Sequence, residues 1–205
     1  MLCLRTYVVV LAIGLAACTS GIRGPSPSST LDPPSTQVAT PTPPSTSPTP
    51  STLAFESERH RYRLRVPSDW QVVQYEGEWT TFDQFGPGAE VPGEDVIAPP
   101  DLSSFLVVNS MTIPTGMSSA EWLARFDARV TSSLDPDCPD TRGKAHLGGE
   151  RATVIEQPCG GSIIVGQSLT HARRGYYFTI RFPEGDQAAE ATLDAIVASI
   201  RFIGR

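Results

Sequence analysis

Few side chains in this sequence could carry acid–base or nucleophilic chemistry. The histidines are His60, His146 and His171, and none has a nucleophile beside it in a catalytic motif. The chain also lacks the nucleophile-elbow, phosphate-loop, paired-histidine zinc and dinucleotide-binding patterns. A hydrolytic site built from Ser162, His171 and a carboxylate would have to assemble in three dimensions, because no spacing supports it. We therefore expect no catalytic residue and no cofactor, with an unrecognised hydrolase site as the alternative.

An acidic stretch is the best sequence candidate for a metal site. Asp135, Asp137 and Asp140 place three carboxylates within six residues, which suggests calcium. The ligand spacing of a calcium-binding loop is not matched, and Pro136 and Pro139 interrupt it. We therefore favour a solvated loop and expect no metal.

The N-terminus has the order of segments found in an exported protein. A short charged region precedes an apolar run at residues 7–15, which is too short to span a bilayer as a helix. Leu15-Ala16-Ala17-Cys18 follows and resembles a bacterial lipobox. The resemblance implies that residues 1–17 are a cleaved signal peptide and that Cys18 carries the lipid. We expect a protein anchored on the extracytoplasmic face of a bacterial membrane; an ordinary secretory signal with an incidental cysteine is the alternative.

A segment rich in proline, serine and threonine follows the predicted anchor. Proline fixes the backbone φ angle and removes an amide donor, so residues 19–52 can form neither helix nor sheet. Few apolar side chains offset the entropy of ordering. We predict a disordered, lipid-anchored linker over residues 18–52 and a single folded domain over 53–205. The linker would act as a spacer, and O-glycosylation of it stays open.

Two cysteines are left after the predicted signal and anchor. Cys138 and Cys159 lie in the folded part of the chain. Two remaining cysteines in an exported protein favour a disulfide. A metal site would need more ligands at compatible spacing, and the chain has only three histidines, so we predict a structural disulfide between them.

The charge balance argues against one class of partner. The chain has a formal charge of −6, and Arg5, Arg23 and Asp32 are its only charged residues before position 53. The folded domain is therefore acidic, at about −7. An acidic domain is a poor binder of polyanions, so we expect no nucleic-acid partner.

Hydrophobic periodicity predicts an antiparallel sheet with two helices packed on it. Strict alternation marks residues 61–66 as a half-buried strand, and a continuous apolar run marks a central strand. The expected strands are residues 61–66, 71–75, 79–85, 105–111, 144–147, 151–157, 162–171, 176–182 and 200–203. Gly148-Gly149 and Arg173-Arg174-Gly175 should turn two hairpins.

Two helices are predicted from caps and from apolar stripes. Ser118 and Glu121 form a capping-box pattern ahead of a helix that should end near Ser133. Asp186 can cap the second. The residues expected on the buried faces are Trp122, Leu123, Phe126 and Val130 in the first helix and Ala189, Leu193, Ile196, Val197 and Ile200 in the second.

A long acidic loop is our candidate for a binding surface. Residues 86–102 are rich in proline, glycine and acid, and long loops inside compact domains are often functional. The residues chosen for the surface are Trp79, Phe82, Phe85, Glu94 and Asp95. The alternative is that the aromatic side chains belong to the core and the loop is a tolerated insertion.

Alternate positions along residues 59–65 are all arginine. Arg59, Arg61, Arg63 and Arg65 should share the face of the strand opposite to the core. An outward polar face is the default for an antiparallel sheet, so we favour a solvated face over a site for an anionic ligand.

Three short motifs resemble those of PsbP-like domains. They are the opening Tyr62–Trp70, the strand start Gly149–Ala152 and the ending Ser199–Phe202, with similarity over residues 55–203. The resemblance implies an α+β fold, implies no catalytic residue, and indicates an accessory, binding or assembly role.

We therefore expect a lipid-anchored accessory or binding protein whose partner is an envelope protein or a small molecule. The alternatives are a cell-envelope hydrolase and a passive spacer. The sequence leaves the oligomeric state open.

Overall fold

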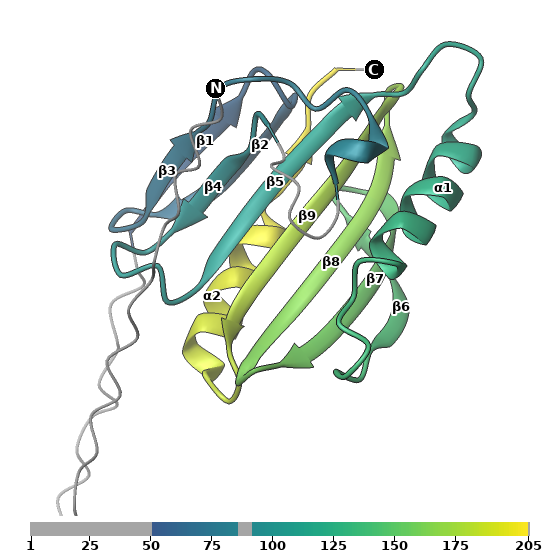
Figure 1. The fold of residues 1–205 in the computed structure, drawn as a ribbon. Helices are drawn as coiled ribbons and strands as arrows, with labels where there is room; N and C mark the ends of the chain where they lie inside the picture. Colours follow the sequence, from purple (N-terminus) through teal and green to yellow (C-terminus); the bar gives the residue numbers. More distant parts are fainter. Residues whose placement is uncertain (1–50, 86–91, 205) are drawn as a thin grey trace, which may run out of the picture. The chain divides into compact units, whose positions relative to one another are not determined.

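The computed structural model describes residues 51–85 and 92–204, all within one compact unit, Ser47–Arg205. The predicted signal peptide, Cys18, nearly all of the predicted linker and residues 86–91 lie outside the described residues. The described part is an α+β domain in which two helices pack on antiparallel sheets, so the predicted fold class is confirmed (Figure 1).

The described residues form ten strands, two α-helices and one 3₁₀ helix. The strands are β1 (Thr52–Ser57), β2 (Tyr62–Pro67), β3 (Gln71–Gln74), β4 (Asp95–Ala98), β5 (Phe105–Thr112), β6 (Thr141–Leu147), β7 (Glu150–Cys159), β8 (Ser162–His171), β9 (Arg174–Pro183) and β10 (Arg201–Phe202). The helices are η1 (Phe82–Gln84), α1 (Ser119–Thr131) and α2 (Gln187–Ala198).

A seven-stranded sheet forms the middle layer. Its order is β3-β4-β5-β9-β8-β7-β6, and every neighbouring pair is antiparallel. The predicted glycine turn between β6 and β7 is present, and both Gly148 (φ 59°) and Gly149 (φ 95°) adopt left-handed backbone. The second predicted hairpin is also present, with Ala172 and Arg173 at its tip.

A three-stranded sheet pairs the first two strands of the domain with its last strand. Its order is β1-β2-β10, and Phe202 of the last strand pairs with Tyr62 of the second. The alternation predicted for residues 61–66 holds, because Tyr62, Leu64 and Val66 are buried while the arginines between them are exposed.

The two helices cover opposite faces of the large sheet (Figure 1). On one face, α2 contributes Leu193 and Ile196 to a core shared with the small sheet. On the other face, α1 contributes Trp122, Phe126 and Val130 to a separate aromatic core. The predicted apolar stripes are therefore the faces by which both helices pack on the sheet.

Both predicted cap residues are in place, but only the serine half of the predicted capping box forms, since the Glu121 carboxylate pairs with Arg125 at 2.8 Å. The Ser118 hydroxyl accepts a hydrogen bond from the Glu121 amide at 3.1 Å, and the Asp186 carboxylate accepts one from the Ala189 amide at 3.0 Å. Each bond satisfies one of the amides left without a partner in the first turn of a helix.

Three local predictions were wrong. Residues 79–85 do not form a strand; they contain η1 and pack on α1. Strand β1 begins at Thr52, where the sequence predicted linker, and β4 lies within the stretch predicted as a long loop. Both missed strands have weak local patterns: β1 is mostly exposed and lacks an alternating apolar pattern, and β4 has only four residues within a stretch rich in proline, glycine and acid.

Candidate functional site

The buried polar side chains of the domain converge at one cluster. His60 lies in the turn between β1 and β2, Asp95 begins β4, and Ser110 lies in β5. The Nδ1 atom of His60 lies 2.8 Å from the Ser110 hydroxyl, and its Nε2 atom lies 2.7 Å from the Gly93 carbonyl oxygen. An Asp95 carboxylate oxygen is 3.9 Å from Nε2. The structure thus assembles a serine, a histidine and an aspartate from three separate elements.

Further donors complete this cluster. The Tyr62 hydroxyl donates to Asp95 Oδ2 at 2.9 Å, and Gln74 Nε2 donates to Asp95 Oδ1 at 3.0 Å. The Arg174 guanidinium donates to the Ser110 hydroxyl oxygen through Nε at 3.1 Å and Nη2 at 2.9 Å. Every functional group in the cluster has a protein partner.

Burial sets the ionisation of the cluster. Desolvation lowers the pKa of His60 below its ordinary 6.5; Asp95 and the Gly93 carbonyl oppose this shift, and the positive charges of Arg174 and Arg59 add to it. Burial, reinforced by the Asp95 carboxylate, raises the pKa of Tyr62 well above 10. His60 is therefore neutral at pH 7. Because a carbonyl oxygen can only accept, Nε2–H donates to Gly93 and the unprotonated Nδ1 accepts from the Ser110 hydroxyl.

The cluster has the composition of a catalytic triad but not its accessibility. Asp95, Ser110 and His60 are 0%, 1% and 2% exposed. A nucleophile must reach the substrate carbon, and the Ser110 oxygen is instead held by His60 and Arg174. Through these hydrogen bonds, His60 links the turn between β1 and β2 to β5 and to the residue pair just before β4. No sequence motif could have located it, since 50 residues separate His60 from Ser110.

The alternative pair considered from the sequence is not assembled. Ser162 and His171 stand at opposite ends of the ten-residue strand β8. At about 3.3 Å per residue, they are roughly 30 Å apart. His171 instead contacts Glu150 Oε1 at 2.8 Å and stacks on Phe202.

The predicted binding surface is largely interior, and this corrects the sequence interpretation. Trp79 is 1% exposed and packs edge-on against Phe126, with ring centroids 5.2 Å apart. Phe82 and Phe85 are partly buried against the same core. Asp95 is fully buried in the polar cluster. The free energy gained by burying these aromatic rings stabilises the fold, so the side chains belong to the core and are not available to a partner.

Glu94 is the one acidic member of that surface that reaches solvent in part. Its carboxylate accepts a hydrogen bond from Asn109 Nδ2 at 3.5 Å. Burial raises the pKa of Glu94 above its usual value, and the Asn109 donor opposes this only in part. Among the described residues, the side-chain oxygen Oδ1 of Asn109 has no hydrogen-bond partner.

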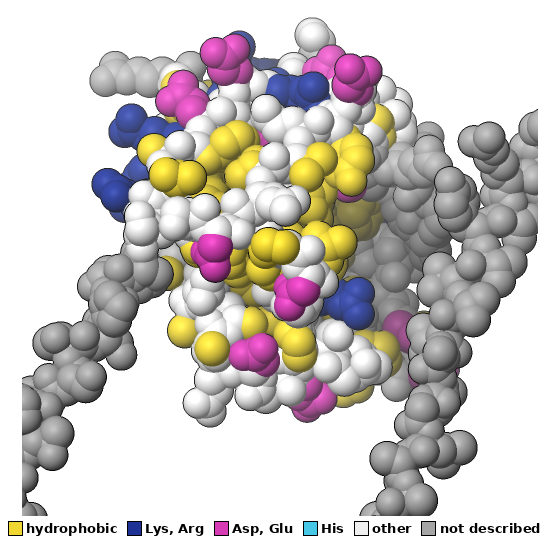
Figure 2. All heavy atoms as spheres, turned by 90° about the vertical axis from the view of Figure 1, so that its left-hand side faces the viewer, with side chains coloured by type: hydrophobic (Ala, Val, Ile, Leu, Met, Phe, Trp, Pro, Cys, Tyr) yellow, Lys and Arg dark blue, Asp and Glu magenta, His cyan; other side chains and the backbone are white. Residues whose placement is uncertain are grey.

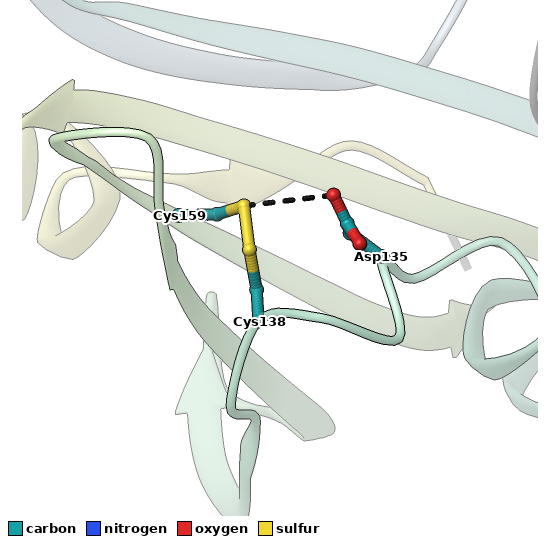
Figure 3. Close-up of side chains that lie close together, drawn as sticks. All are labelled: Asp135, Cys138 and Cys159. Carbon is teal, nitrogen blue, oxygen red and sulfur yellow. Dashed lines mark hydrogen bonds between the residues drawn. A yellow bond between two sulfur atoms is a disulfide. The ribbon is translucent and has the colours of Figure 1, made fainter.

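The predicted disulfide between Cys138 and Cys159 is present in the structure (Figure 3). The two Cα atoms are 5.5 Å apart, and a carboxylate oxygen of Asp135 lies 3.8 Å from the Cys159 sulfur. The Gln157 amide donates to the Asp135 carbonyl oxygen at 2.9 Å and so fixes the loop. Asp135 and the two sulfurs are close enough to hold a metal, but sulfurs joined in a disulfide are not thiolate ligands.

Two open concave surfaces flank α2. One is a pocket of about 370 Å³ over β8 and β9, rimmed by Glu156, Glu184, Glu190 and Asp194. The other is a groove of about 360 Å³ between α2 and the β1–β2 pair, and no carboxylate lines it. Figure 2 shows the left-hand side of the view in Figure 1, where hydrophobic side chains lie interspersed with carboxylates and a group of basic side chains lies at the upper left.

No helix among residues 51–85 and 92–204 is both long and apolar enough to cross a membrane.

No protein-family model and no curated protein matches this chain. Solved structures do match it. Cyanobacterial PsbP (CyanoP) from Synechocystis sp. PCC 6803 has a TM-score of 0.50 and 14% identity over 76% of this chain and 94% of its own. LpqN, a Mycobacterium tuberculosis protein involved in cell envelope biogenesis, has a TM-score of 0.47 and 13% identity over 75% and 91%. The Saccharomyces cerevisiae Ran-binding protein Mog1p has a TM-score of 0.45 and 9% identity over 76% and 97%. The match to CyanoP shows a PsbP-like fold.

Proposed function

We propose that this protein is a lipid-anchored, extracytoplasmic accessory protein that binds a ligand and performs no chemistry. Support for the anchor comes from the lipobox-like Leu15–Cys18 and the proline-rich stretch that follows it. Support for the folded part comes from a PsbP-like domain in which the described residues lining the two concave surfaces beside α2 include no nucleophile–histidine pair.

One observation carries the non-enzymatic assignment. The Ser110–His60–Asp95 cluster is sealed, with each side chain at most 2% exposed. Its polar atoms bond to one another, to Gly93 and to Arg174. A cluster satisfied in this way stabilises the fold, whereas a catalytic one leaves the nucleophile open to substrate.

The hydrogen bond between Ser110 and His60 nevertheless favours a serine hydrolase as the second candidate. A fluorophosphonate probe labels serines activated by a histidine base, so it separates the two functions. We expect no labelling of the native chain above that of Ser110→Ala. Labelling that disappears in Ser110→Ala would overturn the non-enzymatic proposal.

The anchor is tested by membrane fractionation of Cys18→Ala in a bacterial host. The variant should move from the membrane to the soluble fraction and lose the mass of the acyl groups. Cys3→Ala is the matched control, because it removes the other N-terminal cysteine and should leave the protein membrane-bound. Retention of Cys18→Ala in the membrane would contradict the lipobox assignment.

A further inference from the structure

The groove beside α2 has apolar walls. Its apolar lining residues are Ile196, which is buried, and Ala191, Ala195 and Pro67. The remaining residues of its lining are Thr52, Arg65, Thr192 and Ser199. At about 360 Å³ it lies within the size range of small-molecule sites, which is roughly 300–1,000 Å³.

The two hydroxyl groups from α2 and its cap do not make the groove polar. The Ser199 hydroxyl donates to the Ile196 carbonyl oxygen at 2.6 Å and accepts from the Arg65 amide at 2.8 Å. The Thr192 hydroxyl donates to the Ala188 carbonyl oxygen at 2.8 Å. Because both groups already have partners, the groove offers a ligand mainly methyl and methylene surface.

The exposed surface of α2 is divided by charge. Glu190 and Asp194 line the acid-rimmed pocket, while Ala191 and Ala195, one position later in each case, line the apolar groove. A solvent-facing helix surface usually carries charged or polar side chains. The alanine side therefore differs from the acidic side in presenting methyl groups instead of charges.

The groove also has a cationic end. Arg65 lines it, and the same residue lies with Arg63 and Glu56 in an adjoining depression on β1 and β2. Among the residues that the structure describes, neither guanidinium takes part in an ion pair. An arginine beside an apolar wall fits a ligand with an anionic group attached to a hydrocarbon chain.

We propose that this groove binds an anionic single-chain lipid, with the acyl chain along Ala191, Ala195 and Ile196 and the headgroup at Arg65. This names a ligand class for the proposed binding function and rests on it. The acid-rimmed pocket on the other side of α2 would repel such a headgroup. The groove should therefore prefer an anionic ligand and the pocket a cationic one.

The test is calorimetric titration of the full mature chain carrying Cys18→Ala, so that no covalent lipid competes. The probe is a lysophosphatidylglycerol below its micelle concentration. We expect saturable binding of one lipid per chain, weaker binding of lysophosphatidylcholine, and no binding of glycerol phosphate, which has the headgroup charge without the chain. Methyl resonances of Ala191 and Ala195 should shift on titration.

Two variants locate the site. Ala195→Trp fills the groove, and Arg65→Glu reverses the charge at its end; each should weaken binding by about tenfold or more, a loss typical of a blocked apolar contact or a reversed charge. Both residues are exposed, so the variants should fold. The controls are Ala124→Trp on the exposed side of α1 and Arg151→Glu on β7, which should bind as the starting chain does.

Three results would overturn the proposal. They are the absence of saturable binding, equal affinity for the anionic, zwitterionic and headgroup-only probes, and unchanged affinity in both groove variants. Sedimentation that shows a dimer dispersed by Ala195→Trp would likewise overturn it, since the groove would then be an interface between copies. The anchor is absent from this experiment, so failure here is distinct from failure of the Cys18 fractionation test.

Discussion

The imidazole of His60 and the hydroxyl of Ser110 lie 2.8 Å apart in the interior, although 50 residues separate them in the chain. The contact links the turn after β1 to the central strand β5. His60 also holds the Gly93 carbonyl oxygen, just before β4. One buried ring therefore joins three segments, and its protonation state should be coupled to folding.

The first prediction is a loss of stability at acidic pH that depends on His60. Burial lowers the pKa of this histidine in the folded state, so the unfolded chain, with a pKa near 6.5, binds the proton more tightly. The stabilisation is complete above about pH 6.5 and is lost as the pH falls toward the folded-state pKa. Urea denaturation at a series of pH values measures this slope.

His60→Gln should flatten the slope, although it lowers stability at pH 7 by removing part of the network. His146→Gln is the control, because His146 is exposed and has no part in the cluster. If His60→Gln kept the original pH dependence, the histidine would not be the titrating group.

The second prediction concerns Glu94 and has the opposite sign. Burial raises the pKa of this carboxyl in the folded state, so the ionised form opposes folding. The protein is therefore more stable at low pH, where Glu94 is protonated, and it loses this stability as the pH rises through the folded-state pKa. Glu94→Gln should therefore raise the melting temperature at pH 7 and bring little change near pH 3. Glu58→Gln, at an exposed position, should change neither value. A lower melting temperature for Glu94→Gln at pH 7 would show that the charge is stabilised by its surroundings.

The third prediction tests the aromatic core through Gly175. A methyl group at this position would run into the indole ring of Trp122, which lies directly over the backbone of β9. Gly175→Ala should cost about 1–3 kcal/mol of unfolding free energy through overpacking. Gly143→Ala in β6 is the matched control, since nothing lies within 4 Å of the added carbon. Equal urea midpoints for the two variants would contradict the packing of α1 on the sheet.

The fourth prediction is that the disulfide stabilises the domain. Cys138 and Cys159 close a loop with a sequence separation of 21. In the chain-entropy description, a loop of this size contributes about 3 kcal/mol. The double variant Cys138→Ser, Cys159→Ser should lose about this amount in urea denaturation, and dithiothreitol should destabilise only the native chain. Non-reducing peptide mapping that finds two free thiols would refute the pairing.

Local patterns were sufficient for most of the elements. The alternation at Tyr62–Val66, the caps at Ser118 and Asp186, and the glycine pair at 148–149 each act within a few residues, so their outcome does not depend on the rest of the fold. Strands β1 and β4 were missed because β1 is mostly exposed and shows no alternating apolar pattern, and β4 has only four residues inside a stretch rich in proline and glycine.

The candidate site was harder to predict than the fold. Trp79 was placed on a binding surface because the sequence predicts a long acidic loop after it, whereas it is in the core beneath α1. A tryptophan in a loop carries no local sign of which way it faces. Only the packing of Phe126 and Trp122 against it decides its burial.

The sequence by itself determined the two helices and the hairpins, because caps, turns and side-chain periodicity are interactions between near neighbours. It also indicated the cysteine pair, because only Cys138 and Cys159 follow the predicted anchor. The tertiary structure alone decided that Ser110, His60 and Asp95 meet in a closed interior, and that Ala191, Ala195 and Arg65 meet at an open groove. Both outcomes depend on how two sheets and two helices pack, and packing is set by the summed burial of residues distant in sequence.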